Sequence, residues 1–247
     1  MSVWSLLSLM IVVLLLPRLV FSPGITRPVK PEIHGFLRVV AMLNALYCRL
    51  WHRFECIGPA PLPASGAAVL IANHTCGVDH MLLQASSSRL LGFMIAREYY
   101  DKKSIHWICE YIGCIPVDRD GRDYSATRAA LRVLATGRVL PIFPEGRIVP
   151  ESGRTLGPMK PGAAYLAIRA QVPVIPAFIW GTPPTNEIVP SLTTPSEARV
   201  MFGPPIDISE FPRSRAGDKA AQAEVCRRFE HALLTLQARA LANNGNL

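Results

Sequence analysis

A histidine and an aspartate stand five residues apart in the stretch Ile71–His80, IANHTCGVDH, directly after a short apolar run. On one α-helix, His74 and Asp79 would lie about 140° apart and could not meet, because each residue turns the helix by about 100°. They can meet if His74 lies in a loop and Asp79 in the first helical turn, with Asn73 and Thr75 as candidate capping residues. A carboxylate bonded to one ring nitrogen makes the other nitrogen a better base. The spacing therefore predicts a general base at a strand end.

Two other roles compete for this histidine. A histidine beside a strand end can cap a helix or lie in the core with its hydrogen bonds satisfied. A zinc site would need further ligands, and the metallo-β-lactamase pattern H-x-H-x-D-H is one residue shorter than the stretch from His74 to His80. Cys76 stands where the second histidine of that pattern would be. The spacing therefore predicts no metal site.

Short apolar runs alternate with helix-like segments from about residue 67 onward. The runs are Ala67–Ala72, Leu90–Ala96, Cys114–Val117, Val139–Phe143, Val172–Trp180 and Ala198–Phe202. Helical candidates lie near Val78–Ser87, Lys102–Tyr111, Tyr124–Thr136, Lys160–Ala170 and Val225–Ala240. Uniformly apolar strands that alternate with helices predict an α/β domain with a buried, largely parallel sheet flanked by helices. Such sheets bind ligands beyond the carboxyl ends of their strands, which is where His74 would lie.

The N-terminal region differs from this pattern. Val3–Phe21 is nearly free of charge and approaches the roughly 20 residues that a spanning helix needs, although its core would also suit a signal peptide. We expect an uncleaved anchor, and the basic residues Arg18, Arg27 and Lys30 predict that the rest of the chain faces the cytoplasm. Residues 22–32 form a Pro-rich linker, and residues 33–54 carry a helical apolar stripe that suits a core helix or the lipid headgroup layer.

The composition points to a membrane and to anionic partners. Half of the residues are hydrophobic, 18% are charged, and the net charge is +8. A basic balance suits phospholipid surfaces, nucleic acid or phosphorylated substrates, but no dense Lys/Arg block is present, so we expect no nucleic-acid partner. The six cysteines form no CxxC pair, which is typical of reduced, buried thiols, and Cys76 is expected to be one of these packing residues.

Four sequence blocks, in order, resemble the signature of the 1-acylglycerol-3-phosphate acyltransferases, a family of glycerolipid acyltransferases. The first block of that family, N-H-x-x-x-x-D, is matched by Asn73, His74 and Asp79. The other three are matched by GCIPVDR (Gly113–Arg119), IFPEGR (Ile142–Arg147) and VPVIPAF (Val172–Phe178), with KPGAAYLA (Lys160–Ala167) between the last two. The resemblance covers about residues 57–205. It implies a glycerol-3-phosphate acyltransferase-like domain over residues 57–247, after a membrane anchor and amphipathic helix over residues 1–56.

The resemblance implies a membrane-bound O-acyltransferase of phospholipid biosynthesis. Such an enzyme moves a fatty acyl chain from acyl-CoA or acyl-carrier protein to a lysophospholipid hydroxyl, without a cofactor, and its partners are membrane lipids and the thioester donor. His74 would accept the hydroxyl proton, and Asp79 would orient the ring. Many members read F-P-E-G-T-R, whereas here Arg147 follows Gly146 directly. That variant is typical of members that acylate lysophospholipids with larger headgroups, so the acceptor stays open between 1-acylglycerol-3-phosphate and another lyso-lipid.

The resemblance also assigns substrate-binding roles. Arg119 and Arg147 would bind an anionic headgroup, since guanidinium binds phosphate oxygens bidentately, and Arg97 would join them. Glu145 would hold an arginine or the glycerol hydroxyls, and Gly146 would allow close backbone approach.

Two other classes of protein remain as alternatives. An inactive lipid-binding protein would not need His74 with Asp79. A lipid hydrolase would need a metal or a serine nucleophile, and the chain has no G-x-S-x-G elbow.

Overall fold

The computed structural model of the chain describes residues 33, 35–118 and 123–244. The predicted anchor Val3–Phe21 and the linker after it therefore lie outside the described residues, as does Arg119. Within the described ranges, none of the helices combines the length and the apolar character needed to cross a membrane. The division at residues 56 and 57 stays a prediction.

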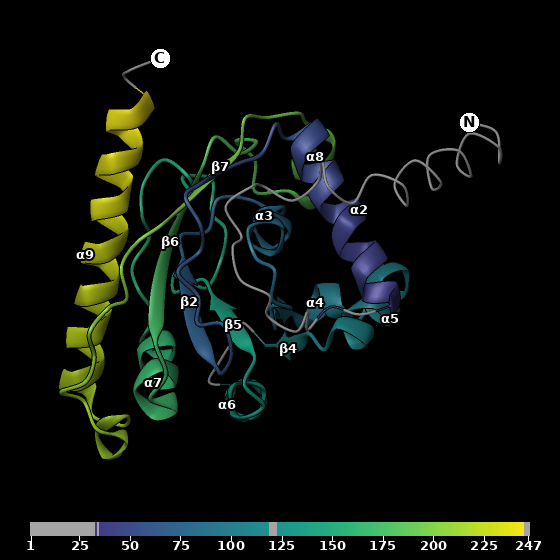
Figure 1. Ribbon diagram of the computed structural model, residues 1–247. Helices are drawn as coiled ribbons and strands as arrows, with labels where there is room; N and C mark the ends of the chain where they lie inside the picture. The colour runs from purple at the N-terminus through teal and green to yellow at the C-terminus, as the bar shows by residue number, and fades with distance from the viewer. Residues whose placement is uncertain (1–32, 34, 119–122, 245–247) are drawn as a thin grey trace, which may run out of the picture.

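A five-stranded sheet forms the centre of the fold, with the strand order β1-β7-β6-β2-β5 (Figure 1). Strand β2 pairs in parallel with both β5 and β6, and β1 pairs in parallel with β7. Strands β6 and β7 are antiparallel. The strands are β1 (Glu55–Ile57), β2 (Ala68–Ala72), β5 (Val139–Ile142), β6 (Val174–Trp180) and β7 (Arg199–Phe202). The predicted α/β architecture with a largely parallel sheet is confirmed, and one antiparallel pair is added to it.

Two further strands are not part of this sheet. Strands β3 (Met94–Ala96) and β4 (Ile115–Val117) pair in parallel with each other as a separate two-stranded sheet. The chain touches the main sheet just before β3, where Leu91 makes a single bridge to Val139 and the Gly92 amide donates to the Val139 carbonyl at 2.9 Å. An apolar run predicts burial but not which sheet a strand joins, so the sequence pattern did not distinguish these two strands from the central ones.

Helices cover both faces of the main sheet (Figure 1). Alternate residues of β2 point to opposite faces: Val69 and Ile71 pack in the cluster built by α6, α7 and α9, whereas Leu70 packs with residues of α2 and α3. These helices are α2 (Gly35–Trp51), α3 (Asp79–Ala85), α6 (Tyr124–Ala135), α7 (Pro161–Ala170) and α9 (Lys219–Asn244). Three more are α4 (Arg97–Tyr100), α5 (Lys103–Ile112) and α8 (Ile188–Thr193). All five residues of β2 are buried, as expected for a central strand covered on both sides.

A buried histidine joins α2 to the segment around α8. His52 is fully buried, its Nε2 lies 2.9 Å from the Tyr47 hydroxyl, and its Nδ1 lies 2.8 Å from the Ser196 hydroxyl. Because Tyr47 donates its hydroxyl proton to the Leu192 carbonyl at 2.6 Å, Nε2 of His52 donates to Tyr47. Burial lowers the pKa of His52 and so favours the neutral imidazole, in which Nδ1 accepts from the Ser196 hydroxyl.

Candidate active site

The ends of three parallel strands meet at the loop that carries His74. Asn73 follows β2, and its side-chain amide makes two bonds to the backbone of Ile179 in β6, donating at 2.8 Å and accepting at 2.7 Å. The His74 amide donates to Glu145 Oε1, just beyond β5, at 2.7 Å. Because β2, β5 and β6 are parallel, these groups come to the same edge of the sheet. The loop is thus held from both sides.

His74 and Asp79 meet as their spacing predicts. His74 lies in the loop, Asp79 begins α3, and Nδ1 of His74 lies 2.7 Å from Oδ2 of Asp79. Oδ2 also accepts from the amides of Thr75 at 2.5 Å and Cys76 at 3.1 Å. Because this oxygen accepts from those amides, Nδ1 acts as the donor of the third bond. With Nδ1 bound to Asp79, the unprotonated Nε2 is the ring nitrogen that can accept a proton from a substrate. The His74 side chain is 7% exposed.

The helix that Asp79 begins lacks the predicted capping bond. The residue before it, Val78, makes no side-chain cap, so the expectation that Asn73 or Thr75 caps this helix is wrong. Asn73 binds β6 instead, and the Thr75 hydroxyl donates to Asp79 Oδ1 at 2.5 Å. The polar side chains of the loop therefore form hydrogen bonds to the Asp79 carboxylate and to strand β6, and they do not cap the helix.

Aromatic rings enclose the imidazole. Phe143 stacks on His74 with the ring centroids 4.1 Å apart and the planes 12° apart. The ring of His80 lies nearly perpendicular to the His74 ring, with the centroids 5.8 Å apart, and it also contacts Phe93 and Phe143. Neither Phe143 nor His80 was predicted from the sequence to be part of the site. The phenylalanine of the F-P-E-G block was the available signal, since that block follows the strand beside β2.

The carboxylate of Glu145 has partners other than those expected. Glu145 is 6% exposed, and its Oε1 and Oε2 accept from the amides of His74 and Gly157, both at 2.7 Å. No ion pair from Glu145 to an arginine is found among the described residues, where backbone amides are its partners instead; its other expected role, toward the glycerol hydroxyls, stays a prediction. The side chain holds the His74 loop and the segment around Gly157 together.

A lysine lies against the glycine of the same block. Gly146 has φ +76°, and a Cβ placed there would come within 2.7–2.8 Å of the last carbons and the nitrogen of the Lys160 side chain. Lys160 is exposed and immediately precedes α7. The close approach that glycine permits is thus made by Lys160, a residue of the KPG stretch for which the sequence predicted no role.

The three predicted arginines differ in what surrounds them. Arg97 begins α4 and forms an ion pair with Asp118, with 2.7 Å between Nε and Oδ1, and this partner raises the pKa of Arg97. Arg147 is exposed, two residues beyond Glu145. Arg119 is outside the described part of the chain. Among the described residues, no hydrogen bond or ion pair joins Arg97 to His74 or Arg147, so the arginines are not brought together there.

Cys76 is poorly suited to be a nucleophile. The side chain is fully buried, and burial together with the charge of Asp79 raises the pKa of its thiol to about 12. A thiol in this state carries almost no thiolate near neutral pH. The position beside Asp79 is therefore a packing position, as expected.

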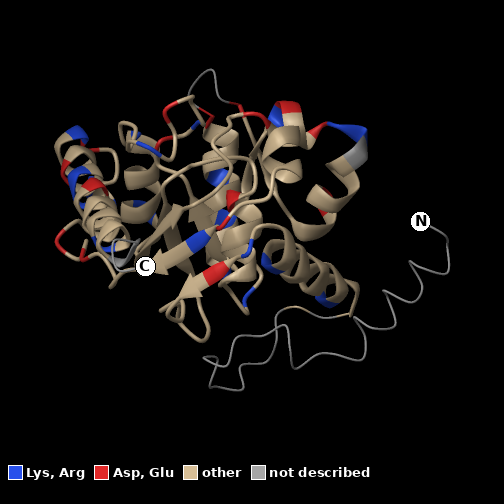
Figure 2. Cartoon of the chain, turned by 90° about the horizontal axis from the view of Figure 1, so that it is seen from above, with Lys and Arg blue, Asp and Glu red and all other residues tan. Residues whose placement is uncertain are grey.

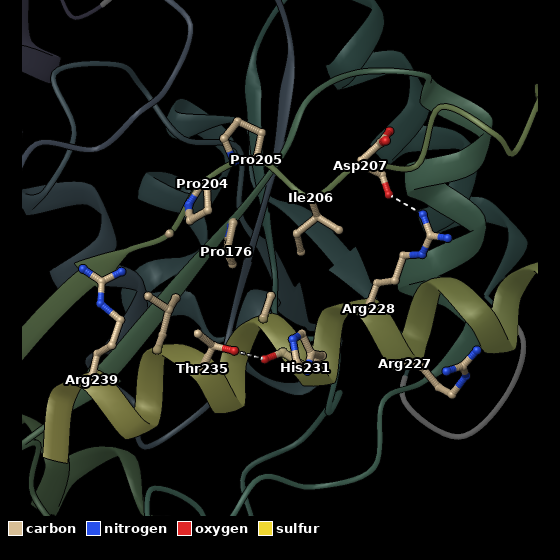
Figure 3. A pocket seen from close by; sticks show the side chains of 13 residues that line it. Pro176, Pro204, Pro205, Ile206, Asp207, Arg227, Arg228, His231, Thr235 and Arg239 are labelled. Atoms are coloured by element: carbon tan, nitrogen blue, oxygen red, sulfur yellow. Dashed lines mark hydrogen bonds between the residues drawn. The ribbon is translucent and has the colours of Figure 1, made fainter. Parts of the chain in front are cut away.

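A cavity of about 570 Å³ lies elsewhere, between α9 and residues 203–207 (Figure 3). Arg228, His231 and Arg239 line it from the helix, and Pro176 lines it from β6. Arg228 donates to the Asp207 carbonyl at 2.7 Å and pairs with Glu224, which offsets its charge. None of the residues around this cavity belongs to the loop of His74.

The chain is similar in sequence and fold to known acyltransferases. A model of the acyltransferase family matches residues 53–180. A 1-acyl-sn-glycerol-3-phosphate acyltransferase of Salmonella typhimurium is 29% identical over 81% of this chain and 79% of its own, and one of Bacillus subtilis is 25% identical over 61% and 72%. The crystal structure of the 1-acyl-sn-glycerophosphate acyltransferase PlsC of Thermotoga maritima has a similar fold, with a TM-score of 0.57 and 21% identity over 81% of this chain and 83% of that one.

Proposed function

The chain belongs to the acyltransferase family, and from this membership we propose that it transfers a fatty acyl chain from acyl-CoA or acyl-carrier protein to a lysophospholipid hydroxyl. The proposed acceptor is 1-acylglycerol-3-phosphate, which the names of the Salmonella typhimurium and Bacillus subtilis relatives share. The observation that carries the proposal is the bond of 2.7 Å between His74 and the buried Asp79, which leaves Nε2 for a substrate.

The proposed reaction uses the free nitrogen of this pair as a general base. Nε2 of His74 takes the proton of the acceptor hydroxyl while the hydroxyl oxygen attacks the thioester carbonyl. A C–O bond forms, the C–S bond breaks, and the imidazolium returns the proton to the departing thiolate. Asp79 stabilises the imidazolium through Nδ1, as the acid of a serine-protease triad does, but here the substrate supplies the hydroxyl.

Basic side chains beside the F-P-E-G turn support an anionic acceptor. Arg147 and Lys160 are both exposed there, and Lys160 lies against Gly146, the residue that follows Glu145. Because Glu145 anchors the histidine loop, a phosphate ester bound by these two cations would lie close to that loop. Arg97 and Arg119 remain proposed contributors on the basis of the family motif.

Exposed aromatic side chains support contact with a membrane. Phe36 of α2 packs against Trp107 and Tyr111 of α5, with ring centroids 6.5 and 5.6 Å away, and all three side chains are about half exposed. Farther along α2, Leu50 is 71% exposed. The helix carries arginines but no acidic residue (Figure 2). Exposed aromatics with basic neighbours are typical of helices in the lipid headgroup layer, and we propose that α2 and α5 lie there.

The proposal is tested by acyl transfer with the membrane-reconstituted protein. Labelled acyl-CoA and acyl-carrier protein are each offered with lyso-lipids that carry phosphate, larger phosphodiester headgroups or an aminolipid headgroup. We expect transfer to lysophosphatidic acid, loss of transfer in His74→Ala, and wild-type rates in the matched control His231→Ala, whose histidine is exposed on α9.

Three outcomes would contradict parts of this proposal. Transfer only to another lyso-lipid would replace the acceptor and keep the chemistry. Transfer that survives in His74→Ala would exclude the mechanism. Binding of lyso-lipids without any transfer by the folded wild type would favour the lipid-binding alternative.

A further inference from the structure

Two threonine hydroxyls form a chain that ends on Asp79. Thr182 donates to Thr75 Oγ1 at 2.9 Å, and Thr75 donates to Asp79 Oδ1 at 2.5 Å. The direction follows from chemistry, because a hydroxyl has one proton and Thr75 gives it to the carboxylate. Thr75 can then only accept from Thr182. The chain joins residues that are 107 positions apart in the sequence.

The backbone after β6 is shaped to place Thr182 over the loop of His74. Gly181 has φ +72°, and a Cβ there would come within 2.1 Å of the Glu197 carbonyl oxygen, so a side chain is excluded. Two residues earlier, Ile179 is bound to Asn73. Thr182 therefore follows a strand end that is already tied to the loop it reaches.

The hydroxyl of Thr75 binds the carboxylate oxygen of Asp79 that the imidazole and the two backbone amides do not bind. Oδ2 of Asp79 accepts from His74 and from the amides of Thr75 and Cys76. Oδ1 accepts from the Thr75 hydroxyl, and the other contact described for it is the Cys76 thiol at 4.0 Å. A buried carboxylate oxygen without a donor is costly, so this hydroxyl sets the rotation of the carboxylate and hence the direction of Oδ2 toward the imidazole.

The turn at Gly153 lies beside the methyl side of Thr75. A Cβ placed on Gly153 would lie 3.5 Å from Cβ and 3.6 Å from Cγ2 of Thr75. The hydroxyl side faces Thr182 and Asp79.

We propose that Thr182 is a positioning residue for the His74–Asp79 pair and that it acts through Thr75. Its hydroxyl holds the Thr75 hydroxyl in the rotamer that donates to Oδ1, and the carboxylate in turn holds the imidazole for proton transfer. This inference rests on the proposed acyltransferase mechanism for its effect on rate. The hydrogen-bond chain itself does not depend on the identity of the substrate.

Matched variants test this role through activity. Thr182→Val removes the hydroxyl at nearly constant volume, and we expect kcat to fall about tenfold with KM unchanged, because one hydrogen bond that orients the base is lost. Thr182→Ser keeps the hydroxyl and should restore kcat to within about twofold of wild type. Thr193→Val, which removes an exposed hydroxyl bonded within α8, is the control and should match wild type.

A double-mutant cycle separates positioning from packing. If Thr182 acts through Thr75, the variant with both Thr75→Val and Thr182→Val should be no slower than Thr75→Val alone. Additive losses in kcat, or a Thr182→Val enzyme with the kcat of wild type, would overturn the proposal.

A second readout does not require the substrate. The low-field proton resonance of His74 Nδ1–H, assigned by its loss in His74→Ala, should shift or exchange faster in Thr182→Val and not in Thr193→Val. An unchanged resonance would overturn the proposed coupling. Activity that survives in His74→Ala would refute the proposed function instead, and the resonance would still decide whether Thr182 positions the pair.

Discussion

Replacement of Asp79 by asparagine separates the charge of this residue from its geometry. The Oδ2 position receives two backbone amides and the imidazole Nδ1–H, so an amide nitrogen there would face three donors. In Asp79→Asn the amide oxygen must therefore stay at the Oδ2 position, and the amide nitrogen takes the Oδ1 position, where it can donate to Thr75 Oγ1. The imidazole keeps its orientation and its tautomer, but its partner is now neutral.

The size of the effect follows from the lost charge. At about 4 Å and an effective dielectric constant of about 20, one pair of opposite charges is worth about 4 kcal/mol, which corresponds to about a thousandfold in rate. We therefore expect kcat of Asp79→Asn to fall about 10³-fold with little change in KM. Asp79→Ala should fall further, because it also loses the orientation of the ring and leaves the amides of Thr75 and Cys76 without this acceptor.

The measurement is steady-state acyl transfer in vesicles, with the folded state of each variant checked by thermal unfolding. A loss in Asp79→Asn as complete as that in His74→Ala would refute the argument that the backbone amides preserve the tautomer. Retention of more than about a tenth of the wild-type kcat would refute the electrostatic role of the carboxylate, since the expected loss is two orders of magnitude larger.

Further predictions concern the headgroup, the fold and the membrane. Lys160→Ala and Arg147→Ala should each raise KM for a phosphate-bearing acceptor about tenfold with a smaller effect on kcat, measured at low salt; an unchanged KM in both would exclude this anion site. Because burial lowers the pKa of His52, its neutral form stabilises the fold fully above the unfolded pKa of about 6.5, and this contribution is lost as the pH falls below that value toward the folded pKa. Urea midpoints at about pH 7.5 and 5.5 should therefore fall more in wild type than in His52→Gln, and equal decreases would contradict the assignment. Trp107→Ser should weaken co-sedimentation with anionic vesicles, whereas the exposed Leu241→Ser on α9 should not.

The sequence alone was sufficient for the parts of this protein that depend on local geometry. Helical periodicity excludes a contact within one helix, so His74 and Asp79 can meet only with His74 in a loop and Asp79 in the first helical turn, which is where they lie. The alternation of apolar runs and helices predicted the α/β architecture, because continuous burial of a strand requires cover on both faces. Four ordered blocks also led to the acyltransferase family, which the match over residues 53–180 shows.

Tertiary structure alone decided which distant groups meet around the histidine. The stacking of Phe143, the two backbone amides on Glu145 and the hydroxyl of Thr182 on Thr75 depend on the register of parallel strands and on the turns after them. An apolar run reports that a strand is buried but not which neighbour it pairs with or in what register. For the same physical reason, the antiparallel pairing of β7 and the departure of β3 and β4 from the main sheet could be seen only in the folded chain.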